Sequence, residues 1–245
     1  MTSGRELAGA DPRVGAGRQL AGADPRLGAC ELEYTVRRSA RAQRVSVKVD
    51  LHAGVEVVLP QRAPARAAAA AVRELRPWID RRLRDTARAR EQVALRAGSV
   101  PYLGVHLPLV PEPGRRLVRR DGDRLLVPAV DPEPALERFF RAAARREIAA
   151  RLDAATQSVG EGYAGLSIRS QRTRWASCSP AGRMSFNWRL MLAPEPVLEY
   201  VVWHEICHLR VRDHSPRFWA LLERRWPTWR AQRDWLRRNG QTLVL

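Results

Sequence analysis

The sequence predicts an α+β protein with two folded parts, and three observations indicate this class. Residues alternate between apolar and polar in two neighbouring segments near residue 50, as half-buried strands do. Apolar residues recur every three to five positions around residue 145, which is typical of one face of a helix. Seven of the eight tryptophans lie from Trp175 onward, which indicates that the C-terminal part has its own aromatic core.

The first 32 residues consist mainly of a short repeat. The segment RELAGADPRVGAG, residues 5–17, returns as RQLAGADPRLGAC, residues 18–30. The repeat occurs only twice and is rich in glycine, alanine and proline, so it cannot bury a core. We therefore expect residues 1–32 to form a disordered extension.

The N-terminal folded part is expected to span residues 33–130 and to be rich in β-hairpins. The alternating segments 44–50 and 54–60 lie on either side of a short turn, as in a hairpin. An alanine-rich helical segment follows, and Pro77 divides it into two helices because proline removes a main-chain donor. More strands come next, with a second hairpin around Asp121-Gly122.

The C-terminal domain is expected to span residues 131–245 and to be compact. Its first helix should bury one face, formed by Leu136, Phe140, Ala143, Ile148 and Leu152. Two strands, over residues 164–179 and 182–193, should follow and form a small sheet. A helix over residues 197–209 and two short helices separated by Pro227 complete the domain.

Three of the five histidines lie within residues 204–214. On a helix, His204 and His208 are one turn apart, so both imidazoles can direct a nitrogen at one ion. Glu205 is rotated by about 100° from His204 and can reach a metal-bound water without being a ligand. This is the HExxH arrangement of zinc hydrolases.

A catalytic zinc site needs a third protein ligand and an open fourth position. His214 follows His208 by six residues, as in metzincins. Metzincins have a glycine at the position of Val211 that lets the chain bend, and this chain does not. The bend must then come from Arg212-Asp213. Glu223, on the next predicted helix, is the alternative third ligand, and we favour His214.

The net charge of +17 comes almost entirely from arginine, and Lys48 is the only lysine. The basic residues are spread along the chain, so we interpret most of them as solvated surface with a non-specific attraction to nucleic acid. No apolar run reaches the roughly 18 residues that span a membrane, and the N-terminus lacks the pattern of a signal peptide. Three cysteines without a CxxC pair argue against a disulfide framework. We expect a cytoplasmic protein with no membrane partner.

Three segments of the chain, RWASCSPAGRMSFNWRL, VLEYVVWHEICHL and HSPRFW, resemble the YgjP-like metallopeptidase family. These small zincins, which are distantly similar to SprT-type proteases, typically show RWGSCS, a strand ending in NWRL, HELxHL and a third histidine before SxxFW. The resemblance covers about Tyr34 to Asn239, with departures at Ala176 and Asp213. It implies a zincin-like catalytic domain in which Glu205 is catalytic and one zinc ion is held by His204, His208 and His214.

These observations predict a zinc metallohydrolase that acts on a peptide or protein substrate. Glu205 would be the general base, and an edge strand beside the metal would hold the peptide by main-chain pairing. The segment GRMSFNWRL is the predicted strand, and the predicted substrate-binding residues are Asn187, Arg189 and Arg174.

Two alternatives to a peptidase follow from the basic residues. The same site could hydrolyse nucleotide phosphoanhydrides, as a nucleoside triphosphate pyrophosphatase does, because arginines gather near it in the sequence: Arg169, Arg172, Arg174 and Arg189. A nucleic-acid-binding protein without enzymatic activity would explain the charge but not Glu205.

Overall fold

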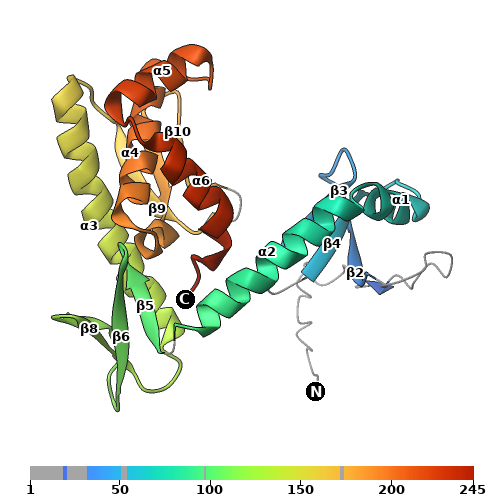
Figure 1. Cartoon of the computed structure of the whole chain (residues 1–245), viewed down its shortest axis with the longest axis horizontal. Coiled ribbons are helices and arrows are strands. Elements are labelled where there is room, and N and C mark those ends of the chain that lie inside the picture. The colour runs from blue at the N-terminus through green and yellow to red at the C-terminus, as the bar shows by residue number, and fades with distance from the viewer. Residues whose placement is uncertain (1–18, 21–31, 51–53, 97, 172–173) are drawn as a thin grey trace, which may run out of the picture. The chain divides into compact units, whose positions relative to one another are not determined.

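The fold is given by a computed structural model that describes residues 19–20, 32–50, 54–96, 98–171 and 174–245. These residues form α-helices and three small sheets, which confirms the predicted α+β class (Figure 1). No helix among them is long and apolar enough to cross a membrane. The extension predicted to be disordered lies outside the described residues, apart from Leu32 and the two-residue strand β1, Gln19–Leu20.

The chain divides into two compact units, the first ending at Arg88 and the second spanning Ala89–Leu245. The domain limit predicted at residue 130 falls inside the second unit. The reason is a shared core, because Leu107 and Leu125 belong to the same buried cluster as Phe140.

The first unit is built on a four-stranded sheet with the order β1-β2-β4-β3. Strands β2 and β4 are parallel, and β3 pairs with β4 in the predicted antiparallel arrangement. Alternate residues of β4, Val55, Val57 and Leu59, are buried in one cluster with Ala68 and Val72 of α1. The bounds of these elements are β2 Tyr34–Ser39, β3 Ser46–Asp50, β4 Gly54–Pro60 and α1 Arg66–Glu74.

The predicted division of the alanine-rich segment at Pro77 is confirmed. Helix α1 ends at Glu74, and α2 spans Arg76–Ala94 with Pro77 in its first turn. A first turn tolerates proline because its main-chain N–H groups have no partner within the helix. Ile79 is fully buried in the core of the first unit.

The second unit begins with a four-stranded sheet of order β5-β6-β8-β7, followed by the long helix α3. The predicted hairpin at Asp121-Gly122 joins β7 to β8. All five apolar residues predicted for the buried face of α3 are buried, which confirms the helical spacing read from the sequence. The bounds are β5 Ser99–Tyr102, β6 Val105–Glu112, β7 Arg119–Asp121, β8 Arg124–Pro128 and α3 Glu133–Val159.

A three-stranded sheet of order β10-β11-β9 comes next. Strand β11 is its central strand, antiparallel to β10 and parallel to β9. The buried residues Met184 and Phe186 of β11 face the core. The bounds are β9 Gly165–Arg169, β10 Ala176–Cys178 and β11 Arg183–Asn187.

The predicted strand over residues 182–193 is wrong in its second half. The chain leaves β11 after Asn187 and forms the 3₁₀-helix η1, Trp188–Leu192. The side chain of Asn187 accepts a hydrogen bond from the main-chain N–H of Arg189 and so caps η1. Leu190, Met191 and Leu192 are buried in succession, which differs from the alternation of a strand with one solvated face.

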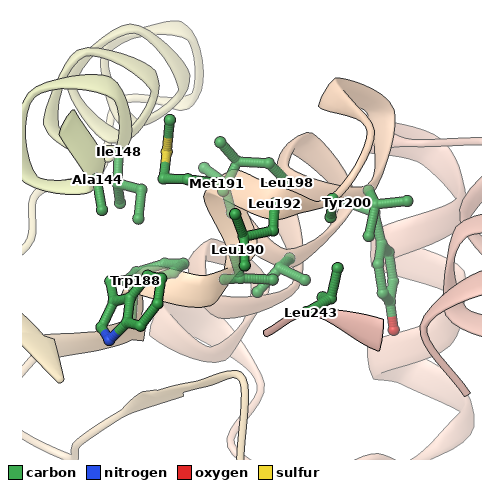
Figure 2. Close-up of a cluster of buried hydrophobic side chains, with 14 of the residues drawn as sticks. Ala144, Ile148, Trp188, Leu190, Met191, Leu192, Leu198, Tyr200 and Leu243 are labelled. Atoms are coloured by element: carbon green, nitrogen blue, oxygen red, sulfur yellow. The ribbon is translucent and has the colours of Figure 1, made fainter. Parts of the chain in front are cut away.

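Residues of η1 form the centre of the core of the second unit. Figure 2 shows Leu190 and Met191 between Ile148 of α3 and Leu198 of the next helix, with Trp188 on the Ile148 side of the cluster. Trp188 also donates its indole N–H to the Ser170 hydroxyl at 2.8 Å. A buried tryptophan whose N–H has a partner fixes the start of η1 against the sheet.

Three helices end the chain, as predicted, and Pro227 lies between the last two. Helix α4 packs between α3 and α6 in the second unit (Figure 1). The bounds are α4 Glu195–Arg210, α5 Pro216–Arg225, α6 Trp229–Asn239 and the 3₁₀-helix η2 Gly240–Thr242.

Gly240 makes a close contact that yields a stability prediction. A Cβ at this position would lie 2.8 Å from Cζ2 in the rigid ring of Trp175, the residue that directly precedes β10. Gly240→Ala should therefore lower the free energy of unfolding by about 1–3 kcal/mol, the usual cost of overpacking. Gly162→Ala is the control, because a Cβ there meets nothing within 4 Å. Urea unfolding of both variants checks this, and equal stability would contradict the packing described for Trp175.

Candidate metal centre

Helix α4 carries the first part of the site. Its core face buries Leu198, Val202 and Ile206, so the helix is fixed in rotation about its axis. His204 and His208 then lie one turn apart on an adjoining face, with ring centroids separated by 4.9 Å. Glu205 points toward β10 and is only 5% exposed.

The loop after α4 brings the third histidine back to the helix. The bend lies at Asp213, as the sequence predicts, and the Asp213 carboxylate accepts a hydrogen bond from the N–H of Ser215 at 3.2 Å. Arg212 anchors the loop by donating to the carbonyl oxygens of Ser179 and Pro180 at 2.6 and 2.7 Å. His214, which follows Asp213, turns its ring toward His204 and His208 of α4.

The three imidazoles converge on one point. Ligand atoms of His204, His208 and His214 all lie within 4.8 Å of one another, and Nε2 of His204 is 3.0 Å from Nε2 of His214. Two tetrahedral ligands at about 2.0–2.1 Å from a zinc ion are about 3.3–3.4 Å apart. The arrangement thus fits a small metal ion bound by three nitrogens.

The protonation of the histidines also fits metal binding. His208 donates its Nδ1–H to the carbonyl oxygen of Val211 at 2.9 Å, which leaves Nε2 as the nitrogen with a free lone pair. Burial lowers the pKa of His204 to about 3, with further lowering from the two neighbouring histidines. Burial likewise lowers the pKa of His208. Both rings are therefore neutral at pH 7, the form that binds metals.

Glu205 has the environment of a proton acceptor. Its carboxyl group accepts a hydrogen bond from the main-chain N–H of Cys178, while Oε2 is buried and has no hydrogen-bond partner. Burial raises the pKa of Glu205 to about 8, although the charge of Arg174 and the Cys178 N–H oppose this rise. A pKa close to neutrality suits a group that must take up and release a proton.

Glu223, the alternative third ligand, is held elsewhere. Its carboxylate forms a two-pronged ion pair with Arg230, at 2.6 and 3.1 Å, on the solvent-exposed side of α5. The hydrogen bond from Arg230 lowers the pKa of Glu223. Glu223 is not part of the histidine cluster.

The predicted substrate-binding residues lie in three different environments. Arg174 is exposed and close enough to Glu205 for its charge to act on that carboxyl group. Asn187 is 2% exposed, and its side-chain amide bonds to the main chain, donating to the carbonyl of Gln171 at 2.7 Å and accepting from the N–H of Arg189. The guanidinium of Arg189 lies over the ring of Trp188, 4.8 Å from its centroid. Of these three side chains, only that of Arg174 influences the pKa of Glu205 through its charge.

The prediction that GRMSFNWRL forms the edge strand is wrong. GRMSFNWRL contains β11, which is paired on both sides and has no free main-chain groups for a peptide. The edge strand that lies beside α4 is β10. The main chains of Trp175 and Ser179 hydrogen-bond to β11. Because the main-chain groups of successive residues in a strand point to opposite sides, the N–H and C=O groups of Ala176 and Cys178 point to the open edge. The sequence gives no signal for this, because strand order depends on long-range pairing.

An α+β unit with an HExxH helix, a third histidine and a buried glutamate defines the class of metal-dependent hydrolases. The family model described as YgjP-like, metallopeptidase domain, matches residues 43–239. The chain therefore belongs to the YgjP-like metallopeptidase family, and by its family it is a metal-dependent peptidase.

Two solved structures are similar to parts of the chain. The metallopeptidase zymogen abylysin of Pyrococcus abyssi has 21% identity and a TM-score of 0.36, and the match covers 40% of this chain and 99% of that one. The metallopeptidase zymogen jannalysin of Methanocaldococcus jannaschii has 20% identity and a TM-score of 0.29, and the match covers 31% and 79%. No curated protein matches the chain.

Proposed function

We propose that the chain is a zinc-dependent peptidase in which His204, His208 and His214 hold the ion and Glu205 activates the attacking water. One observation carries the proposal, namely that three imidazole nitrogens converge beside a buried carboxyl group with an unpartnered oxygen. When bound, zinc supplies Lewis-acid chemistry, which polarises a carbonyl group and acidifies water.

Glu205 moves the proton. Its Oε2 has no competing partner, so it can accept a proton from a water molecule that attacks the peptide carbonyl. The hydrogen bond from Cys178 keeps the carboxyl group in place while this happens. The same oxygen then returns the proton to the leaving amine, which departs as a neutral group.

Strand β10 provides the place for the peptide. An extended peptide can add to the open edge of β10 by pairing with the main chain of Ala176 and with the carbonyl of Cys178. The main chain of Cys178 would then pair with the substrate through its carbonyl group, while its N–H donates to the Glu205 carboxyl group. The scissile bond would therefore lie close to Glu205. Arg174 lies just before the start of β10, and its exposed guanidinium can contact a substrate carbonyl or carboxylate.

Hydrolysis of nucleotide phosphoanhydrides is the second candidate function. The outer face of the three-stranded sheet has a hollow of about 440 Å³ that includes Arg169 and Arg183. None of the described residues that line it is acidic, and two of its serines, Ser177 and Ser179, flank Cys178. Phosphate groups would suit this hollow, but it does not account for the peptidase family to which the chain belongs.

Metal removal tests the proposal. Dialysis against a chelator should abolish cleavage of a mixed peptide library, and one equivalent of Zn²⁺ per chain should restore it. Nucleoside triphosphates are incubated with the same samples. Zinc-dependent release of inorganic phosphate or pyrophosphate with intact peptides would favour the second candidate. Peptide cleavage that survives chelation would contradict both.

A further inference from the structure

We infer that Trp219 is a positioning residue that holds the His214 ring for metal binding by stacking on it. The inference rests on the proposed function, because it takes His214 to be a zinc ligand. It concerns how that ligand, which comes from a loop and not from the metal helix, is kept in place.

The three histidines differ in how their rings are supported. His204 and His208 project from α4, and His208 is fixed by its hydrogen bond to the Val211 carbonyl. His214 is exposed, and among the described residues its only hydrogen-bond contact is with His204. Metal-binding histidines usually donate their second N–H to a carbonyl or carboxylate, which orients the ring. His214 has no such partner in the described chain, so another contact must orient it.

Ring stacking supplies this contact. The ring of Trp219, in the first turns of α5, stacks on the His214 ring with centroids 5.5 Å apart and planes at 30°. Phe218 meets the His214 ring edge-on at 4.9 Å. The buried Phe218 also packs on His204 and His208, at 4.8 and 4.5 Å, so it supports all three ligands. Of these two side chains, Trp219 is the one that stacks face to face on the His214 ring.

Trp219 is itself held from the far side. Its ring stacks on Trp229 of α6, with centroids 4.5 Å apart and planes at 19°. Trp229 is 3% exposed, and the guanidinium groups of Arg230 and Arg233 lie over its ring at 4.6 and 4.8 Å. Trp219 thus contacts rings on the His214 loop and on α6, and it also meets the His204 ring of α4 edge-on at 6.1 Å.

This stack explains the role of Glu223 and of the segment HSPRFW. Glu223, which the sequence offers as a ligand, pairs with Arg230 and keeps that guanidinium over Trp229. The HSPRFW segment therefore contributes a ligand and, five residues later, the ring that orients it. Pre-orienting an exposed side chain reduces the ordering that metal binding would otherwise require, so it raises the affinity.

The test is a double-mutant cycle on the full-length protein, read out as the zinc dissociation constant in competition with a chromogenic chelator. Trp219→Leu should weaken zinc binding about 10- to 100-fold, the usual effect of losing a group that orients a ligand. Trp219→Phe, which keeps a flat ring, should stay within a few-fold of the wild type. Trp235→Leu on α6 is the control, since this tryptophan makes none of the ring contacts described for the stack. The zinc affinity of the Trp235→Leu variant should equal that of the wild type.

The second arm of the cycle repeats Trp219→Leu in a His214→Ala background. If Trp219 acts through His214, its replacement should have almost no further effect there, whereas a general loosening of the fold would weaken zinc binding equally in both backgrounds. Circular dichroism of the zinc-free variants checks folding, and Trp219→Met replaces Trp219→Leu if the latter does not fold.

Additive effects, or wild-type zinc affinity in a folded Trp219→Leu variant, would overturn the inference and leave the proposed function standing. A wild-type protein that binds no zinc, or a His214→Ala variant with full affinity, would instead refute the ligand set itself.

Discussion

Glu205→Gln is expected to abolish peptide hydrolysis while the protein stays folded and keeps its metal. The amide has nearly the same size as the carboxyl group and can still accept the hydrogen bond from Cys178, but it cannot take up a proton. Removal of a general base usually lowers the rate by about 10²- to 10⁴-fold. The measurement is kcat for a cleaved peptide, together with zinc content by elemental analysis.

Glu133→Gln is the matched control, because Glu133 is an exposed carboxylate at the start of α3. It should leave both kcat and zinc content unchanged. Near wild-type turnover by Glu205→Gln would show that another group accepts the proton. Loss of zinc together with activity would mean that Glu205 supports the metal site and would leave its role as a base without support.

His214→Ala is expected to reduce the zinc content from about one ion per chain to a small fraction. Loss of a group that only orients a ligand typically weakens metal binding about 10- to 100-fold. Loss of a direct ligand should weaken it further. Glu223→Ala should keep the full zinc content, because the Glu223 carboxylate is paired with Arg230 away from the histidines. His106→Ala is the control for removal of an exposed histidine outside the cluster.

The opposite pattern would overturn the ligand assignment. If Glu223→Ala lost zinc while His214→Ala retained it, the Glu223–Arg230 ion pair would have to open when metal binds. Elemental analysis of the four proteins, dialysed side by side against the same zinc concentration, distinguishes the two sets of ligands.

The sequence predicts the metal helix well because its information is local. The spacing of apolar residues in 197–209 determines which face of the helix packs into the core. His204, Glu205 and His208 lie on the other faces of the same helix. The bend at Asp213 is likewise local, since a carboxylate that accepts from the N–H two residues later forms a turn by itself. The long helix α3 was predictable for the same reason.

The errors concern contacts between segments that are distant in the sequence. The alternating pattern of residues 183–187 predicts a strand but not its neighbours, so it cannot reveal that β11 is central and β10 is the edge strand. The end of β11 depends on a single cap, which the Asn187 side chain provides to the N–H of Arg189. The stack of Trp219 on Trp229 unites two helices and a loop, and no spacing rule indicates it.

We expect this chain to hydrolyse peptide bonds with a metal ion held by His204, His208 and His214. A peptide library is incubated with the zinc-loaded protein in H₂¹⁸O, and the products are measured by mass spectrometry. New C-termini that carry one ¹⁸O atom should be formed by the wild type and not by Glu205→Gln. An unchanged library after incubation with the wild type, with ¹⁸O found instead in phosphate released from nucleoside triphosphates, would contradict this expectation.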